Sequence, residues 1–110
     1  GAAASIASNI GSLAPRQRPL AQLVDVVSGG SHAITSAQVT IGRERSVSDI
    51  ALHDPNVSRR HAQLTYRLGL VVEDLNSTNG TLVNNRRITR CPLRNGDLLT
   101  FGLSTFEFRG

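Results

Sequence analysis

Residues 62–83 read AQLTYRLGLVVEDLNSTNGTLV. Three short runs rich in apolar and β-branched residues lie in this stretch, at 62–68, 70–75 and 81–83, separated first by a glycine and then by a polar loop. Runs of this kind between turn residues are typical of β-strands. Because no apolar residues keep a helical spacing over three turns, the stretch predicts three consecutive strands.

The same pattern of short apolar runs between turn residues continues on both sides of this stretch. Further strands are expected at residues 20–27, 33–41, 97–101 and 105–108, with clusters of Gly, Asn, Asp, Pro and Ser between them. Seven or more short strands, with no helix to cover a parallel sheet, predict an all-β fold: an antiparallel β-sandwich of two sheets. Functional residues are expected in the loops gathered at the ends of such a sandwich.

The chain divides into a short arm and one domain. Residues 1–19 are rich in Ala, Ser, Asn, Gly and Pro and lack apolar periodicity, which predicts a disordered arm or linker. Residues 20–110 are expected to form the domain. A chain of 110 residues buries roughly two thirds of its unfolded surface, which supports a core without disulfides or a structural metal. No Met occurs, even at position 1, so we expect either a fragment or a processed form.

The composition indicates in which cellular compartment the protein is expected and which cofactors or ligands it is expected to bind. Cys91 is the one cysteine, and no Cys/His spacing typical of zinc sites occurs, so neither a disulfide nor a metal site is expected. No run approaches the ~18 apolar residues of a membrane span, and Gly1–Ser5 lacks the basic start of a secretory signal. We therefore expect a cytoplasmic protein without a cofactor.

The net charge of +4 is modest beside that of DNA-binding proteins, so the charge alone does not indicate a nucleic-acid ligand.

Three loops place Arg, hydroxyl and amide side chains beside predicted strands. They are Ile41-Gly42-Arg43, Val57-Ser58-Arg59-Arg60-His61 and Asn76-Ser77-Thr78-Asn79-Gly80-Thr81. Guanidinium groups bind phosphate through paired hydrogen bonds, and hydroxyl and amide groups donate to the same kind of oxygen. The three loops together therefore favour an anionic, phosphate-bearing ligand.

Each loop also has a purely structural interpretation. Arg43 alone is typical of a solvated residue at a strand end, and His61 borders a strand, as buried and hydrogen-bonded histidines do. Asn79-Gly80 is a strong hairpin-turn dipeptide, and that role explains it in most proteins. Ser77, Thr78 and Asn79 nevertheless exceed what such a turn requires.

The order and spacing of these loops resemble those of the forkhead-associated (FHA) domain family. The resemblance covers roughly residues 21–109, and six blocks in the family's order make it specific. The blocks are Ile41-Gly42-Arg43, Ser48-Asp49-Ile50-Ala51-Leu52, Val57-Ser58-Arg59-Arg60-His61-Ala62, Asp74-Leu75-Asn76-Ser77-Thr78-Asn79-Gly80-Thr81, Val83-Asn84 and Leu93-Arg94-Asn95-Gly96-Asp97, followed by Phe101-Gly102. The family implies a two-sheet β-sandwich that binds phosphothreonine peptides.

The resemblance also implies roles for five residues as phosphothreonine-binding groups. Arg43 corresponds to the Arg that holds the phosphate, and Ser58 corresponds to the hydroxyl that donates to it. Arg59 stands where the family often adds a phosphate contact. Thr78 corresponds to the residue near the phosphate and the threonine methyl group, and Asn79 corresponds to the amide that holds the ligand main chain.

For five further positions the resemblance implies roles in shaping the loops or in ligand preference rather than in binding the phosphothreonine itself. Gly42 and His61 match residues that shape the binding loops in the family, and Gly80 is likewise interpreted as structural. Asn56 and Arg60 lie where the family varies and are expected to tune which residues flank the phosphothreonine.

The function that the resemblance implies is a signalling adaptor downstream of Ser/Thr kinases. The expected partner is a Thr-phosphorylated protein or peptide, a Ser/Thr kinase or a substrate of one. No membrane contact is expected, and the domain is predicted to be monomeric within a larger protein. No catalytic residues are expected: Ser58 and His61 as nucleophile and base lack an oxyanion hole and an orienting carboxylate in the sequence.

Two alternatives stay open at this point. One is a scaffold that binds a partner protein without phosphate through a face of the sandwich. The other, less favoured, is nucleic-acid binding, for which the aromatic residues sit in strand patterns typical of a core rather than of a base-stacking surface. Its basic residues are Arg59, Arg60, Arg86, Arg87 and Arg90.

Overall fold

The computed structural model describes residues 19–110 and contains eleven strands in that part of the chain. The predicted disordered arm, residues 1–19, lies outside the described residues except for Pro19. The strands are β1 (Ala21–Asp25), β2 (Ser31–Ile34), β3 (Gln38–Gly42), β4 (Ile50–Ala51), β5 (Ala62–Tyr66), β6 (Leu70–Asp74), β7 (Thr81–Val83), β8 (Arg86–Ile88), β9 (Arg90–Pro92), β10 (Leu98–Phe101) and β11 (Ser104–Arg109).

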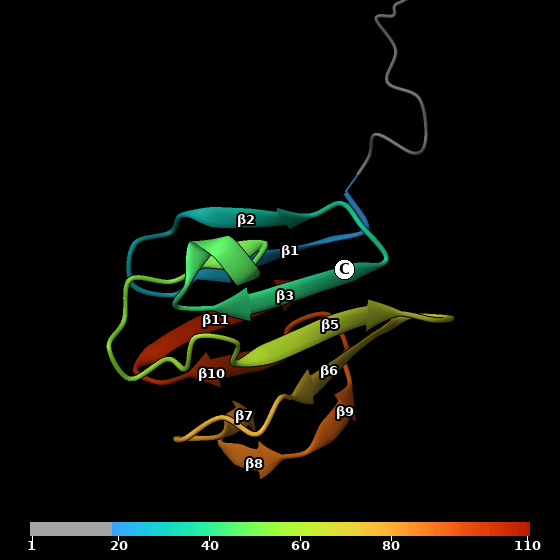
Figure 1. Cartoon of the computed structure of the whole chain (residues 1–110). Helices are drawn as coiled ribbons and strands as arrows, with labels where there is room; N and C mark the ends of the chain where they lie inside the picture. Colours follow the sequence, from blue (N-terminus) through green and yellow to red (C-terminus); the bar gives the residue numbers. More distant parts are fainter. Residues whose placement is uncertain (1–18) are drawn as a thin grey trace, which may run out of the picture.

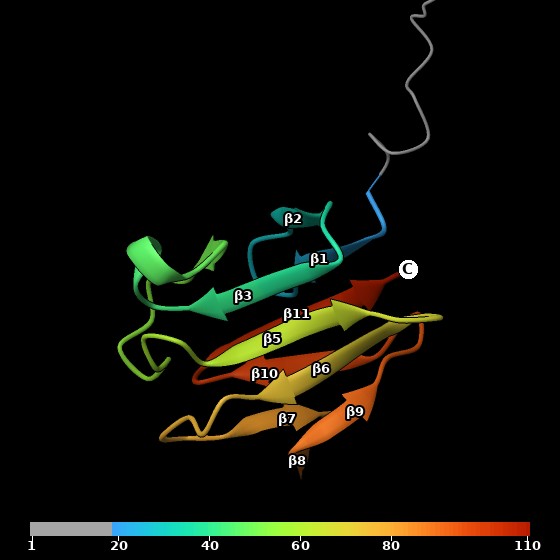
Figure 2. The ribbon, with the colours of Figure 1, turned by 45° about the vertical axis from the view of Figure 1, so that its right-hand side comes forward.

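The strands form two sheets that pack face to face (Figures 1 and 2). One sheet has the order β2-β1-β11-β10-β7-β8, and the other has the order β4-β3-β5-β6-β9. The predicted all-β sandwich is therefore confirmed. One detail differs, because β3 and β4 pair in parallel, so the second sheet is mixed rather than purely antiparallel. A single 3-10 turn, η2 (Arg45–Val47), connects these two strands.

The predicted strand 33–41 is wrong as one element, because the chain changes sheets within it. Ile34 ends β2 in the six-stranded sheet, and Val39 lies in β3 of the five-stranded sheet. Both side chains are buried. Since successive residues of a strand point to opposite faces, an unbroken strand would turn one of these two residues toward solvent. The chain therefore crosses from one sheet to the other at residues 35–37.

The prediction also missed three short strands, β4, β8 and β9. Asn79-Gly80 does not close a hairpin, since β6 and β7 belong to different sheets. A tight hairpin turn lies instead at Asn84 and Asn85, between β7 and β8, where both residues have positive φ angles of 51° and 69°. Two consecutive left-handed residues match the twist of the flanking strands.

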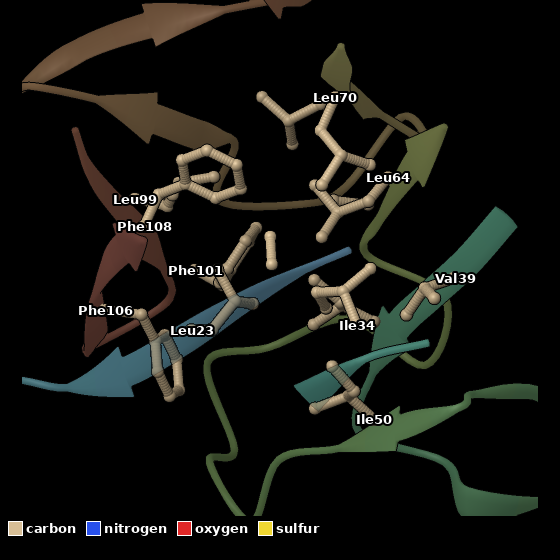
Figure 3. Close-up of a cluster of buried hydrophobic side chains, with 14 of the residues drawn as sticks. Leu23, Ile34, Val39, Ile50, Leu64, Leu70, Leu99, Phe101, Phe106 and Phe108 are labelled. Carbon is tan, nitrogen blue, oxygen red and sulfur yellow. The ribbon is translucent and has the colours of Figure 1, made fainter. Parts of the chain in front are cut away.

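The core fills the space between the two sheets (Figure 3). It takes its side chains from both layers, and the members that are fully shielded from solvent, at 0% exposure, are Ile34, Ile41, Ala62, Leu64, Val72, Leu99 and Phe101. Among the described residues, no helix is long and apolar enough to cross a membrane.

Shortening a core side chain tests this packing. Leu64→Ala is expected to lower the free energy of unfolding by about 2–5 kcal/mol, because it removes apolar contacts and leaves a cavity. Leu103→Ala is the matched control, since Leu103 is 81% exposed. Urea unfolding of both variants measures the difference. Equal losses in the two variants would contradict the assignment of Leu64 to the core.

Candidate functional site

Three loops meet at the end of the sandwich opposite the C-terminus (Figure 1). They enclose an open groove of about 450 Å³. The groove is lined by Arg43, Pro55, Asn56, Val57, Ser58, Arg59, Arg60, Thr78 and Asn79. All seven residues predicted to contact a ligand or tune its flanks are therefore on one surface. Pro55 and Val57 line it as well and were not predicted.

Hydrogen bonds from both the side chain and the backbone of Arg43 hold it against the loop that carries Ser58. Its Nε donates a hydrogen bond of 2.9 Å to the carbonyl oxygen of Val57, and its backbone N–H donates one of 2.9 Å to the carbonyl oxygen of Ser58. The two terminal nitrogens of the guanidinium make no hydrogen bond to the described residues. They keep the paired donor geometry that suits a phosphate or carboxylate.

Gly42 allows this arrangement, because a Cβ there would overlap the carbonyl oxygen of Arg59 and come within 2.6 Å of Ser48 Oγ. The end of β3 therefore runs directly against the loop that carries Ser58. Any larger residue at position 42 would push that loop away. The predicted loop-shaping role of Gly42 rests on this close approach.

Ser58 connects the second loop to the third. Its Oγ accepts a hydrogen bond of 3.0 Å from the backbone N–H of Thr78. A hydroxyl that accepts from a backbone N–H still has its own proton to donate. Ser58 therefore has a donor available at the groove that Arg43 also lines.

His61 lies behind the groove and is fully buried. Its Nδ1 accepts a hydrogen bond of 3.0 Å from the backbone N–H of Ser58. Nδ1 therefore carries no proton, so Nε2 carries it and donates to the carbonyl oxygen of Gly80 at 2.8 Å. The ring also meets Phe101 edge-on, at 5.7 Å between ring centroids. His61 thus joins two binding loops to the core.

Two further contacts fix groove residues. Asn79 Nδ2 donates a hydrogen bond of 2.8 Å to the carbonyl oxygen of Asn56. Arg59 Nε lies 3.8 Å from the Glu44 carboxylate, and the two side chains are 75% and 46% exposed. Exposed ion pairs of this length contribute little to stability. No Asp or Glu lines the groove itself, so among the described residues its charge is positive.

Asp54 supports the loop that carries Asn56, and it was not predicted. Its carboxylate accepts hydrogen bonds from the backbone N–H of Asn56 at 2.8 Å, from the backbone N–H of Leu103 at 2.9 Å and from the Ser104 hydroxyl at 2.8 Å. Burial raises the pKa of Asp54, but these hydrogen bonds outweigh it and hold the pKa below its usual value. Asp54 thus ties the groove to the β10–β11 turn of the other sheet.

Asp74 supports the loop that carries Thr78 and Asn79. One carboxylate oxygen accepts from the hydroxyls of Ser77 at 2.6 Å and Thr81 at 2.8 Å, and the other accepts from the backbone N–H of Ser77 at 3.1 Å. Burial raises the pKa of Asp74, and the hydrogen bonds lower it further than burial raises it. The sequence carries a general signal for this role, since Asp side chains commonly stabilise turns by bonding the backbone just ahead of them.

The FHA domain family model matches residues 39–102 of this chain. The chain belongs to the FHA domain family. The match begins in β3 and ends after β10, so it includes every residue of the groove. FHA domains bind phosphopeptides and are not enzymes as a class.

Curated relatives are identical to this FHA domain at about a third of the aligned positions. The transcriptional regulatory protein EmbR of Mycobacterium tuberculosis is 34% identical over 88% of this chain and 25% of its own length. FhaA of the same organism is 36% identical over 78% of this chain and 16% of its own length. The chain thus spans a quarter or less of these relatives.

Solved structures agree with the fold. A structure of Mycobacterium tuberculosis EmbR in complex with a low-affinity phosphopeptide has a TM-score of 0.78 and 35% identity, and it covers 81% of this chain and 24% of that chain. A second structure, from work on phosphothreonine-dependent FHA domain interactions, has a TM-score of 0.76 and 33% identity, with 82% and 95% covered.

The lowered pKa values of Asp54 and Asp74, together with the lowered pKa of Asp25, which accepts from the backbone N–H groups of Val27 and Ser28, make stability sensitive to acid. A carboxylate whose pKa is lower in the folded state contributes stability that is complete above its ordinary pKa and is lost as the pH falls through the folded value. Urea unfolding from pH 7 to pH 2.5 is therefore expected to show a loss below about pH 4. Asp74→Asn is expected to be less stable at pH 7 and to show a shallower acid slope. Parallel profiles for the two proteins would contradict this account.

Proposed function

We propose that this FHA domain binds threonine-phosphorylated protein segments in the groove and acts as an adaptor downstream of Ser/Thr kinases. The observation that carries the proposal is the convergence of free donors on one surface. The terminal nitrogens of Arg43 and the hydroxyl of Ser58 face the same groove, which contains no acidic side chain. A doubly charged phosphate accepts from several such donors at once.

The positions of the groove residues support a separate role for each of them in ligand binding. Arg43 and Ser58 hold the phosphate, and Arg59 beside them adds charge. The side chain of Asn79 is fixed by its hydrogen bond to the carbonyl oxygen of Asn56. It therefore presents its side-chain oxygen and its remaining N–H proton to the main chain of an extended ligand. Thr78 lies next to Ser58 through its backbone and forms the wall near the threonine methyl group.

Two groove residues are proposed to determine which residues are preferred next to the phosphothreonine. Asn56 and Arg60 both line the groove. They are placed to contact the residues that flank the phosphothreonine. The solved EmbR complex with a phosphopeptide supports a peptide ligand for this chain as well. The proposed partner is a Thr-phosphorylated protein, a kinase or a kinase substrate in the cytoplasm.

We also infer that the site is not catalytic. Both ring nitrogens of His61 are engaged by backbone groups, Nδ1 with Ser58 N–H and Nε2 with Gly80 C=O. The imidazole therefore has no lone pair left to take a proton from the Ser58 hydroxyl, as a general base must. Nucleic-acid binding also lacks support, because Phe101, Phe106 and Phe108 are buried and a single exposed aromatic residue, Tyr66, is left for stacking on bases.

Calorimetric titration tests the proposal directly. A library of phosphothreonine peptides is compared with matched phosphoserine and unphosphorylated sets. Binding in the micromolar range is expected for phosphothreonine peptides, because charge-assisted hydrogen bonds of roughly 1.5–3 kcal/mol each exceed the cost of ordering a short peptide. Equal binding of the unphosphorylated set would favour the phosphate-independent scaffold instead.

Replacing Arg43 identifies the phosphate contact within the same experiment. Arg43→Ala is expected to weaken phosphothreonine-peptide binding by about 2–5 kcal/mol, since it leaves the phosphate poorly paired. Arg67→Ala is the matched control, because Arg67 follows β5 at the opposite end of the sandwich and lies outside the groove. Affinity of the Arg43 variant within threefold of the wild type would overturn the assignment.

A further inference from the structure

Three arginines line the groove, and two of them have contacts that account for their positions. Arg43 donates through Nε to the carbonyl oxygen of Val57, which leaves its terminal nitrogens for the phosphate. Arg59 Nε lies 3.8 Å from Glu44 Oε1, and Glu44 Oε2 accepts a hydrogen bond of 3.0 Å from the Ser46 hydroxyl. Glu44 is therefore held beside Arg59 and offsets part of its charge.

Arg60 is the third of these arginines, and its charge is not offset in this way. The ion pairs within residues 19–110 join Arg59 to Glu44 and Arg109 to Glu107, so no carboxylate of the described chain pairs with Arg60. Arg60 is exposed and lines the groove. Its guanidinium group is thus available to an anionic group of a bound ligand.

The backbone that carries Arg60 is fixed on both sides. The next residue, His61, is fully buried, and its backbone N–H donates a hydrogen bond of 2.8 Å to the carbonyl oxygen of Ile41. On the other side, the carbonyl oxygen of Arg59 accepts a hydrogen bond of 3.0 Å from the Ser48 hydroxyl. Because this backbone is ordered before a ligand arrives, an ion pair formed by Arg60 has only side-chain entropy to overcome.

We propose that Arg60 binds the carboxylate of an Asp or Glu that flanks the phosphothreonine, so that the domain selects threonine-phosphorylated segments of acidic sequence. This inference rests on the proposed binding of phosphothreonine in the groove. The planar guanidinium group offers two parallel N–H donors, which match the two oxygens of a carboxylate. A Lys or Arg at the same ligand position meets a like charge, which weakens binding. The kinase that supplies such ligands therefore phosphorylates threonine within acidic segments.

The acidic residue is expected close to the phosphothreonine in the ligand sequence. Arg60 and Arg43 line one groove of about 450 Å³. Consecutive residues of an extended peptide advance by roughly 3.3–3.6 Å, so a ligand with its phosphate at Arg43 reaches Arg60 within a few residues. The gain is modest, because exposed ion pairs change an affinity by about two- to fivefold.

Calorimetric titration with matched peptides tests this proposal. A parent phosphothreonine peptide with alanine flanks is compared with derivatives that carry one Asp, one Lys or one phosphoserine at each flanking position in turn. At one of these positions the wild type is expected to bind the Asp peptide about two- to fivefold tighter than the parent, and the Lys peptide more weakly. The phosphoserine peptides separate a carboxylate from a second phosphate, whose oxygens accept from the same donors.

Variants of Arg60 assign the preference to this side chain. The measured quantity is the ratio of the affinities for the Asp peptide and the parent peptide, so a general change in affinity cancels. Arg60→Gln is expected to bring this ratio to about one, and Arg60→Glu is expected to reverse the preference in favour of the Lys peptide. Arg45→Gln is the matched control and is expected to keep the wild-type ratio, because it removes the same charge from η2, outside the groove.

The outcomes that overturn the proposal differ from those that overturn the groove function. An Asp peptide that binds no tighter than the parent at any position overturns the proposal, and so does a ratio that both Arg60 variants leave unchanged. A gain that appears with phosphoserine and not with Asp assigns Arg60 to a second phosphate and overturns it as well. Failure of every phosphothreonine peptide to bind contradicts the groove function and this proposal together, whereas parent binding without an Asp gain contradicts this proposal alone.

Discussion

The buried imidazole of His61 holds together the two loops on which the groove depends. It accepts from the backbone of Ser58 and donates to the backbone of Gly80, and Phe101 packs against its ring. Both hydrogen bonds go to main-chain atoms. Two groove side chains link the same loops, since Ser58 Oγ accepts from the Thr78 N–H and Asn79 Nδ2 donates to the Asn56 carbonyl oxygen. The spacing of the loops therefore depends on His61, Ser58 and Asn79 together.

Two carboxylates reinforce this arrangement of the loops from either side. Asp54 binds the loop that carries Asn56 to the six-stranded sheet, and Asp74 binds the turn that precedes Thr78. Asp54 is buried and Asp74 is partly buried, and each accepts three hydrogen bonds, which is why its pKa falls despite the burial. A groove built in this way is ordered before a ligand arrives, and binding then costs little conformational entropy.

The sequence predicts the sandwich because strands depend on local patterns. The seven ligand-contacting or flank-tuning residues that the family resemblance indicates all line one groove. Alternating apolar residues indicate strands, and loops with Arg and Ser stand out between them. The crossing between Ile34 and Val39 is not visible locally, since no charge or proline marks it. Asp54 was missed for a related reason: its partners Leu103 and Ser104 lie about fifty residues further along the chain. The role of Asn79-Gly80 likewise depends on which sheet each neighbouring strand joins.

A backbone amide titration followed by NMR tests the central claim that the loop end of the sandwich is the phosphothreonine site. We expect a phosphothreonine peptide to shift the amide signals of Arg43, Ser58 and Asn79, which surround the free donors of the groove. The amides of Arg67 and Gly69, at the opposite end, are expected to stay in place. Shifts confined to a sheet face or to the opposite end, with the groove amides unmoved, would contradict the account.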